Sequence, residues 1–169
     1  MSSAIDNELT PYYNPFATEG EEISSTYEGR HILVAEGDLV HVDTGGDGLV
    51  NKGQPVSFGL HFFGQGVGIA MKSATSETQA VPIDTEGIWR CKVFSTFGMV
   101  VGQVVFIDSG GNLIDWPVDG TEHIFGYVLQ PIAAPENGDP TEAIVVVKVH
   151  WMDTGIWWYF FIYLWGNRK

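Results

Sequence analysis

Short apolar runs alternate with turn-forming stretches over most of the chain, from about residue 31 to residue 150. The runs are rich in β-branched and aromatic residues, and no stretch repeats its apolar residues at the period of a helix. The stretches between them contain Gly, Asn, Asp and Pro, which favour tight hairpins. The predicted strands are Ile32–Ala35, Leu39–Val42, Gly66–Met71, Ala80–Ile83, Ile88–Phe94, Val100–Ile107, Ile124–Leu129 and Ala143–His150. This pattern predicts an all-β fold, a compact β-barrel or sandwich, with at most one short helical turn near Asp115–Thr121.

Part of the pattern occurs twice, in the same order. Each copy has a strand that ends in an Asp-Thr/Ser-Gly-Gly turn. A strand containing Gly and Val follows, and then a segment that begins with Thr and continues into an apolar run. The matched segments are Gly37–Gly46 with Gly102–Gly111, Gly66–Ala70 with Phe125–Leu129, and Thr78–Ile83 with Thr141–Val146. Two copies are too few for a solenoid, so we expect two pseudo-repeats of one β unit that close into a single domain.

The beginning of the chain differs from this middle region. It is polar and acidic, lacks periodicity, and contains Pro11 and Pro15, which favour extended backbone at the residues before them. We interpret it as an extended N-terminal arm. The arm also carries an aromatic cluster, Tyr12, Tyr13 and Phe16, which is either a docking element or a patch that folds back on the core.

The end of the chain contains ten consecutive apolar or aromatic residues, Ile156–Trp165. This is about half the length of a transmembrane helix, so we do not expect a membrane span. The absence of alternation is typical of a strand that is covered on both faces. A subunit or partner interface would provide that cover; the last core strand of a monomer and attachment to a membrane surface are the alternatives. The chain thus divides into an arm (1–30), a β-barrel domain (31–150) and a C-terminal aromatic extension (151–169).

Charge and composition narrow the possible partners. The chain has 8 Lys and Arg against 21 Asp and Glu, and its formal net charge of −13 repels the phosphates of nucleic acids. The single cysteine, Cys91, cannot form an intrachain disulfide, and we expect it in the core. The first residues have neither the positive charge nor the apolar run of a secretory signal, so we expect the chain to be made in a cytoplasm.

Two turns match a catalytic motif. Val42–Gly45 and Ile107–Gly110 look like the hydrophobic-Asp-Thr/Ser-Gly signatures of pepsin-like aspartic proteases, in which two carboxylates share a proton and activate water. However, two-motif proteases of that family are much longer, and here a Gly (Gly46, Gly111) follows each motif where Ser, Thr or Ala is normal. A third Asp-Thr-Gly begins at Asp153, outside the repeat. Asp followed by small residues and Gly is the expected composition of a hairpin turn, which is the preferred interpretation.

No other pattern indicates a catalytic or metal site. The acidic turn around Asp43 and Asp47 lacks the alternating oxygen ligands of a calcium loop. The five histidines stand singly, without partners at the spacing of a zinc site. Neither a Walker loop nor a dinucleotide-binding glycine motif is present. We therefore expect no catalytic residue, no metal and no cofactor.

Seven short motifs follow one another across residues 36–149. They are Gly37–Val40, Gly53–Val56, Gly66–Ala70, Ala80–Trp89, Gly102–Gly111, Ile124–Leu129 and Ala143–Val149. Their order resembles the capsid decoration or cement proteins of tailed phages, a family long grouped under a domain of unknown function and sometimes labelled phage recombinases. The resemblance implies a compact β-barrel on the outside of a capsid, often trimeric at three-fold positions. Neither the arm nor the aromatic extension is part of the family core.

The sequence therefore predicts a non-enzymatic virion protein, made in the cytoplasm of a bacterial host and located on the outer capsid surface. Its predicted partners are the major capsid protein and its own copies in a homotrimer, with no nucleic acid and no membrane. The predicted capsid or subunit contacts are Tyr12, Tyr13, Phe16, Trp157, Trp158, Phe160, Phe161, Tyr163 and Trp165. The alternative is a carbohydrate- or receptor-binding module of a virion, which requires Trp89, Trp116 and Trp151 to be exposed for stacking on sugars.

Overall fold

The computed structural model describes residues 19–20, 22–24, 31–59, 65–118, 120–135 and 139–150. In these residues the fold is all-β, as the sequence predicts, with one 3-10 turn, η1 (Glu36–Asp38), and no α-helix. The strands are β1 (Glu22–Ser24), β2 (His31–Ala35), β3 (Leu39–Val40), β4 (Pro55–Phe58), β5 (Gly66–Ala70), β6 (Ala80–Asp84), β7 (Ile88–Ser95), β8 (Val104–Ile107), β9 (Leu113–Ile114), β10 (His123–Val128) and β11 (Thr141–Val149). This part of the chain contains no helix that is long and apolar enough to cross a membrane.

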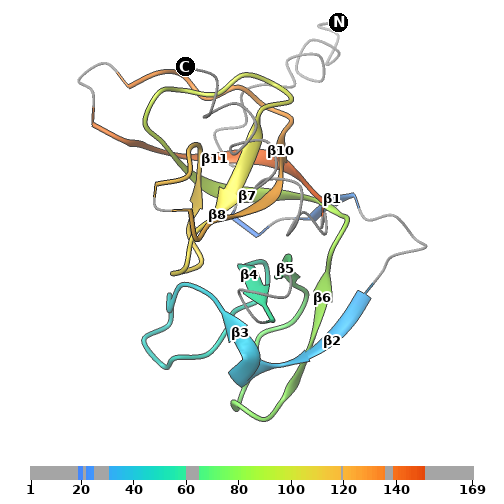
Figure 1. Cartoon of the computed structure of the whole chain (residues 1–169). Coiled ribbons are helices and arrows are strands. Elements are labelled where there is room, and N and C mark those ends of the chain that lie inside the picture. The colour runs from blue at the N-terminus through green and yellow to red at the C-terminus, as the bar shows by residue number, and fades with distance from the viewer. Residues whose placement is uncertain are drawn as a thin grey trace, which may run out of the picture.

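The second half of the chain forms a closed barrel of strands β7 to β11 (Figure 1). β7 pairs with β11, β11 with β10, β10 with β8, and β8 with β9, all antiparallel. The short β9 closes the ring because it also pairs in parallel with β7, which places Leu113 opposite Val93. β1 pairs with β7 near Ile88 and Trp89, so a segment inside the predicted N-terminal arm extends the barrel sheet.

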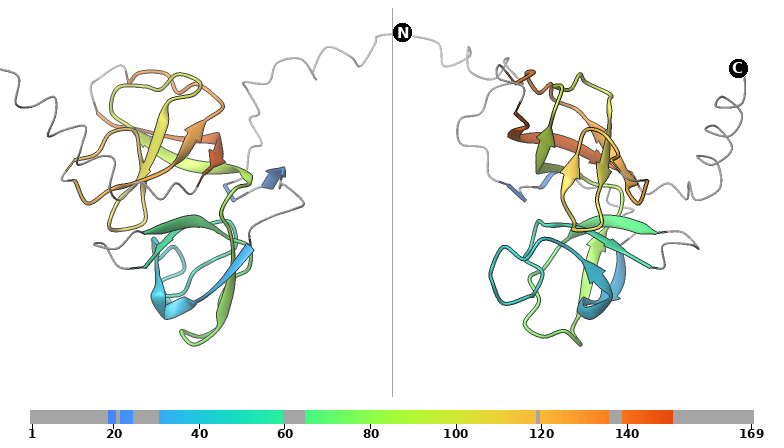
Figure 2. Two further views of the ribbon diagram at one scale, coloured as in Figure 1. Left: turned by 45° about the vertical axis from the view of Figure 1, so that its right-hand side comes forward. Right: turned by 60° about the vertical axis from the view of Figure 1, so that its left-hand side comes forward.

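The first half forms a second sheet, in the order β2-β6-β5-β4-β3. Each half thus contributes five strands, and two pairings recur: β2 with β6 corresponds to β7 with β11, and β5 with β6 corresponds to β10 with β11. This correspondence supports the duplicated unit that the sequence predicts. The halves differ in that β5 pairs with β4 whereas its counterpart β10 pairs with β8, and in that β9 closes a ring in the second half. Figure 2 shows the two bodies stacked, with the second sheet below the barrel.

β5 lies between two hydrophobic cores and is buried along its whole length. Val67 and Ile69 belong to the barrel core, which surrounds the fully buried Trp89 and Phe125. Ala70 belongs to the core of the second sheet. Because both faces of this strand are covered by protein, β5 joins the two sheets into one packed unit.

The glycines of β5 make this double burial possible. A Cβ atom at Gly66 would overlap the ring of Phe58, and one at Gly68 would overlap Cγ2 of Ile83 and lie 2.6 Å from the carbonyl oxygen of Asp84. Since side chains alternate along a strand, the small residues face the second core while the two large ones face the barrel. The glycines therefore mark a close approach of neighbouring strands.

A buried carboxylate holds the turn that links the two halves. Asp84, at the end of β6, accepts hydrogen bonds at Oδ1 from the backbone N–H groups of Glu86 (3.0 Å) and Gly87 (2.9 Å). Its Oδ2 accepts one from the indole N–H of Trp89 at 2.8 Å. A Cβ atom at Gly87 would overlap that carboxylate, so glycine is required there. The start of β7 is thereby positioned by three hydrogen bonds to one side chain.

A second buried carboxylate holds the other end of β7. Oδ2 of Asp115 accepts hydrogen bonds from the hydroxyl of Ser95 (2.9 Å) and from the backbone N–H groups of Thr96 (2.7 Å) and Phe97 (3.1 Å). The short helical turn predicted near Asp115–Thr121 is wrong: in the described residues of this range there is no helix. The carboxylate of Asp115 could cap a local helix, but it instead accepts hydrogen bonds from backbone N–H groups of the distant β7–β8 loop.

Two predicted strands are shorter than expected. The run Val100–Ile107 becomes β8 only from Val104, because the chain turns at Val100–Gln103: the N–H of Gln103 donates to the carbonyl of Val100 (3.1 Å), and Gly102 has a φ of +87°. The run Leu39–Val42 pairs only over the two residues of β3. The sequence analysis does not predict β1, β4 or β9, since β4 contains Pro55 and the polar Ser57 and the others are very short.

The substitution Gly68→Ala should lower the free energy of unfolding by about 1 to 3 kcal/mol, because the added methyl group overpacks the contact between β5 and β6. Gly37→Ala is the matched control, since its Cβ would lie 3.4 Å from the carbonyl oxygen of Glu77, which is ordinary contact. Thermal unfolding of both variants measures the difference. Equal melting temperatures would contradict the double burial of β5.

Candidate interaction surface

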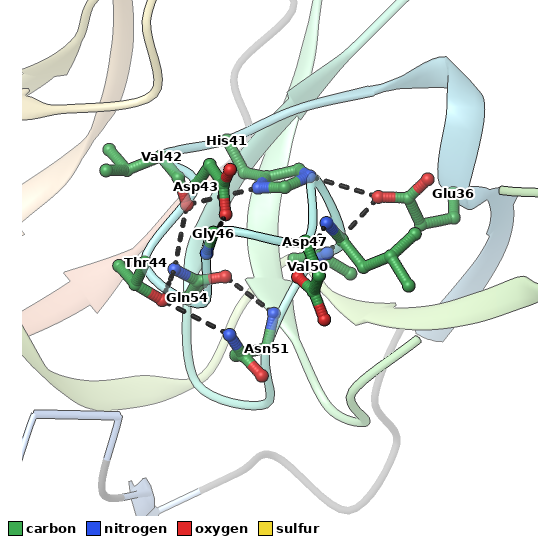
Figure 3. Close-up of polar contacts among 11 residues, drawn as sticks. Glu36, His41, Val42, Asp43, Thr44, Gly46, Asp47, Val50, Asn51 and Gln54 are labelled. Carbon is green, nitrogen blue, oxygen red and sulfur yellow. Dashed lines mark hydrogen bonds and ion pairs between the residues drawn. The ribbon is translucent and has the colours of Figure 1, made fainter. Parts of the chain in front are cut away.

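The loop of residues 41–54 connects β3 to β4 and is held by side-chain hydrogen bonds (Figure 3). Its first anchor is Glu36, which is buried: Oε1 accepts a hydrogen bond from the N–H of Val50 (3.2 Å) and lies 3.0 Å from Nε2 of His41. Nδ1 of His41 lies 3.2 Å from the carbonyl oxygen of Val42. Glu36 thereby ties the beginning of the loop to its far side.

The buried Gln54 is the second anchor of this loop. Its side-chain NH2 donates to the carbonyl of Val42 (3.0 Å) and to Oγ1 of Thr44 (2.8 Å), and its Oε1 accepts from the N–H of Asn51 (2.6 Å). Asn51 also donates to Oγ1 of Thr44 at 3.2 Å. Because these bonds join both ends of the loop, its exposed residues are held in one arrangement.

The carboxylates of the two Asp-containing turns accept hydrogen bonds within their own turns. Asp43 accepts a hydrogen bond from the N–H of Gly46 at 2.6 Å. Asp108 accepts from the N–H groups of Gly110 (2.8 Å) and Asn112 (2.8 Å) and from the side-chain amide of Asn112 (3.0 Å). Within the described residues the two carboxylates make no hydrogen bond to each other. Each carboxylate thus holds its own turn, which agrees with the interpretation of both motifs as hairpin turns.

The turn after β8 nevertheless packs against the loop after β3. A Cβ atom at Gly111 would lie 2.6 Å from Cα of His41 and 2.8 Å from the backbone nitrogen of Val42, and Gly111 has a φ of +87°. The duplicated turns thus meet at the seam between barrel and second sheet. Glycine at this position allows the two backbones to touch.

A small cavity of about 90 Å³ lies at the same seam. Lys92 borders it and pairs with Glu142 (2.7 Å), with Glu19 at 3.9 Å; the hydrogen bond to Glu142 raises the pKa of the lysine. Sites for small molecules are typically about 300 Å³ or larger, so this cavity is too small for one. In the described residues no group of His, Cys, Asp and Glu side chains could hold a metal ion.

Apart from Leu33 on β2, the described apolar side chains that are most exposed stand on loops of the barrel. We call them the barrel-end surface: Phe97, Val100, Val101, Trp116, Val118 and Leu129. Phe97, Val100 and Val118 are each at least 70% exposed. β7 starts at the turn from the second sheet and ends at Ser95, so the loop that carries Phe97 and Val100 lies at the end of the barrel away from that sheet.

The loops that carry this surface are tied to one another. Met99 and Ile132 exchange two backbone hydrogen bonds of 2.9 Å each, which joins the β7–β8 loop to the β10–β11 loop. Asp115 bonds to the N–H of Phe97, which brings the β9–β10 loop to the same place. The exposed apolar side chains of these loops are therefore presented on a fixed support, which makes the barrel-end surface a candidate interaction surface.

The predicted contact residues of the two tails lie outside the described residues. A carbohydrate-binding module would require Trp89, Trp116 and Trp151 to be exposed. Of these, Trp89 is fully buried, Trp116 is exposed, and Trp151 lies outside the described residues. Cys91 is fully buried, as predicted, and burial raises the pKa of its thiol.

The sequence analysis does not single out the barrel-end surface. It assigns Val100 and Val101 to a strand, where half of the side chains would be buried. The available signal is the pair of glycines, Gly98 and Gly102, that enclose this stretch and adopt positive φ. Glycines this closely spaced are typical of a loop rather than of a strand interior.

A model of the phage cement protein family matches residues 34–148, which is more than half of the 169-residue chain. The chain belongs to the phage cement protein family. The resemblance noted in the sequence is thereby confirmed. No curated protein and no solved structure matches the chain significantly.

The phage cement proteins are structural proteins associated with the virion capsid, and this chain shares that role. The matched residues begin in β2 and end in β11, so they include both sheets, the seam between them and the barrel-end surface. They include neither tail. The family core therefore coincides with the packed β body of this cement protein.

The two turn carboxylates should differ in their effect on stability. Asp108→Ala should lower the free energy of unfolding by about 1 to 2 kcal/mol, because it removes bonds to two backbone N–H groups and one side chain. Asp43→Ala, which removes one bond to Gly46, should lower it by less than about 1 kcal/mol. Chemical denaturation measures both values. Proteolysis at acid pH that disappears in both Asp43→Asn and Asp108→Asn would instead support the protease interpretation.

Proposed function

We propose that this chain is a non-enzymatic capsid decoration protein that binds the outer surface of a phage head as a homotrimer and stabilises contacts between major capsid protein subunits. The observation that carries the proposal is the family match over residues 34–148, which include most of the β body. The exposed apolar side chains of the barrel-end surface support it, because they stand on loops that are fixed by hydrogen bonds. A protein that clamps a shell needs a stiff body with apolar contact points.

In this proposal each part of the chain has its own task. Residues 31–150 form the body of the trimer, and residues 1–30 latch onto the major capsid protein. Residues 151–169 supply trimer or capsid contacts. The contact side chains of the tails are Tyr12, Tyr13, Phe16, Trp157, Trp158, Phe160, Phe161, Tyr163 and Trp165. The protein is made in the cytoplasm of the bacterial host and uses no cofactor, nucleic acid or membrane.

Charge and copy number fit this role. A net charge of −13 keeps the free protein soluble at high concentration and disfavours binding to nucleic acid. On a shell, many copies bind at once, so a modest affinity of each contact is multiplied by avidity. The protein therefore needs no single contact of high affinity to stay bound to the capsid.

A second function, recognition of a glycan or host receptor by the virion, is supported by the exposure of Trp116. Its side chain is 65% exposed on the barrel-end surface, where an aromatic face is available for stacking on a sugar. Quenching of tryptophan fluorescence by glycans, lost in Trp116→Ala, would reveal this function. The proposed decoration function predicts no such quenching.

Truncation after Gly155 should abolish trimers or capsid binding, because it removes the ten apolar residues Ile156–Trp165. Truncation after Trp165, which removes only Gly166–Lys169, is the matched control. Light scattering gives the mass of each purified form, and the number of copies on purified capsids gives its occupancy. If the shorter form keeps both the trimer mass and the capsid occupancy of the full chain, the proposed anchor is wrong.

The double substitution Phe97→Ser and Val100→Ser should reduce capsid occupancy at least about tenfold, a loss equivalent to about 1.4 kcal/mol. Both side chains are at least 70% exposed, so the melting temperature should change little. Val42→Ser is the control. Val42 is also an exposed apolar residue but lies at the seam and not on the barrel-end surface, so this variant should bind capsids normally. Normal occupancy of the double variant would exclude the barrel-end surface as a capsid contact.

A further inference from the structure

β2 is an edge strand of the second sheet whose outer side has no partner among the described residues. It pairs with β6 only, in a register that places Leu33 opposite Pro82 and Ile32 opposite Ile83. The outer side of a strand presents N–H and C=O groups that another strand can pair with. Whether β2 offers such groups depends on which of its residues point away from β6.

The proline on β6 decides that direction. Pro82 has no N–H, and its carbonyl oxygen accepts a hydrogen bond from the N–H of Met71 (2.9 Å), on the side of β6 away from β2. In an antiparallel pair, residues alternate between hydrogen-bonded and non-hydrogen-bonded positions. Leu33, opposite Pro82, is therefore at a non-hydrogen-bonded position, and its N–H and C=O point outward together with those of His31 and Ala35.

This outer edge lacks the features that usually protect a sheet edge. β2 contains no proline, no lysine and no bulge, and its register with β6 is regular over all five residues. The side chain of Leu33 is 72% exposed, while Ile32 and Val34 pack against the second core. The edge is thus a regular, apolar template for strand addition.

One segment of this chain has the chemistry of the missing strand. Ile156–Trp165 has ten β-branched, aromatic or other apolar residues, without proline, glycine or charge. The N-terminal arm is less suited, because Pro11 and Pro15 interrupt its aromatic cluster and cannot donate to a ladder. The C-terminal segment is the better candidate on composition.

The described chain ends close to β2. The N–H of Val149 donates to the carbonyl of Gly87 (2.9 Å), and His31 pairs with Asp84, so both contact the short turn between β6 and β7. The six Cα–Cα steps from His150 to Ile156 can span at most about 21 Å. The described chain therefore ends near the turn that adjoins the start of β2, which places a β2 edge within reach of the linker.

Both faces of a strand formed by Ile156–Trp165 would be apolar, which favours binding to the β2 edge of an adjacent copy over the edge of its own copy. A strand added to β2 has one face beside Ile32 and Val34, where the second core continues, and the other beside the exposed Leu33. Within a single copy that second face would stay in water. When copies exchange their extensions in a closed ring, each strand has a neighbouring body to cover it, and every edge is used.

We infer that the outer edge of β2 binds the segment Ile156–Trp165 of a second copy of this chain by β-strand addition. This inference rests on the proposed assembly of several copies and assigns the place at which they join. Leu33 contributes backbone hydrogen bonds and apolar contact, and the aromatic segment supplies the added strand.

Leu33→Lys should weaken self-association at least about tenfold in the full-length protein, because a charge then stands beside the apolar segment. Leu33→Pro should do the same by removing the outward N–H of this residue. Val100→Lys places the same charge on an equally exposed valine of the barrel-end surface and should keep the wild-type mass. Light scattering over a range of concentrations measures the masses, and circular dichroism verifies that each variant is folded.

Disulfide trapping distinguishes a second copy from the same copy. Leu33→Cys and Phe160→Cys variants are mixed under mild oxidation; the native Cys91 is buried and does not compete. We expect a covalent dimer in the mixture and none in either variant alone. A double variant that closes its disulfide within one chain, with no covalent dimer in the mixture, would show pairing in the same copy and overturn the inference.

The truncation described above separates this inference from the proposed function. If truncation after Gly155 dissociates the protein while Leu33→Lys and Leu33→Pro keep the wild-type mass, the segment binds elsewhere and the β2 inference is wrong, whereas the decoration function stands. A wild-type protein that is monomeric at all concentrations also overturns the inference, whatever its capsid binding. If the Leu33 variants keep the wild-type mass but lose capsid occupancy, the β2 edge contacts the capsid and the inference of strand addition between copies is wrong.

Discussion

β5 has to fill two hydrophobic cores at once, and the rest of the body depends on that constraint. Val67 and Ile69 supply large side chains to the barrel, while Gly66, Gly68 and Ala70 leave room for the core of the second sheet. A strand with large residues on both faces would push the sheets apart, since protein interiors have no free volume to absorb them. The two halves of the duplicated chain therefore form one body because one of them contributes a strand that is small on one face.

Polar side chains then make the connections of this body rigid. Asp84 holds the start of β7, Asp115 holds its end, and Glu36 and Gln54 hold the long loop at the seam. Each of these side chains is buried and accepts or donates several hydrogen bonds, which removes the cost of leaving a polar group unpaired. The acidic residues that resemble a catalytic pair serve the same purpose in their turns. These polar side chains hold the loops of the body in place through hydrogen bonds.

This body exposes apolar groups in two places. The barrel-end surface lies at the end of the barrel away from the second sheet, and the outer edge of β2 lies on that sheet, so the two are separate. Separate contact regions suit a cement protein, because one can face the shell while another joins neighbouring copies. The acidic charge limits non-specific association of the same apolar groups before assembly.

Local periodicity, turn residues and motif order were sufficient to predict the all-β class, the duplication, the strands β2, β5, β6, β7, β10 and β11, and the family. The sequence also placed Cys91 in the core correctly. Only the tertiary structure decided that the two-residue β9 closes the ring, that Asp115 serves a distant loop, and that Val100 and Val101 are exposed. Each of these outcomes depends on contacts between residues far apart in the chain, and a side chain's burial or an edge's lack of a partner exists only once those contacts have formed.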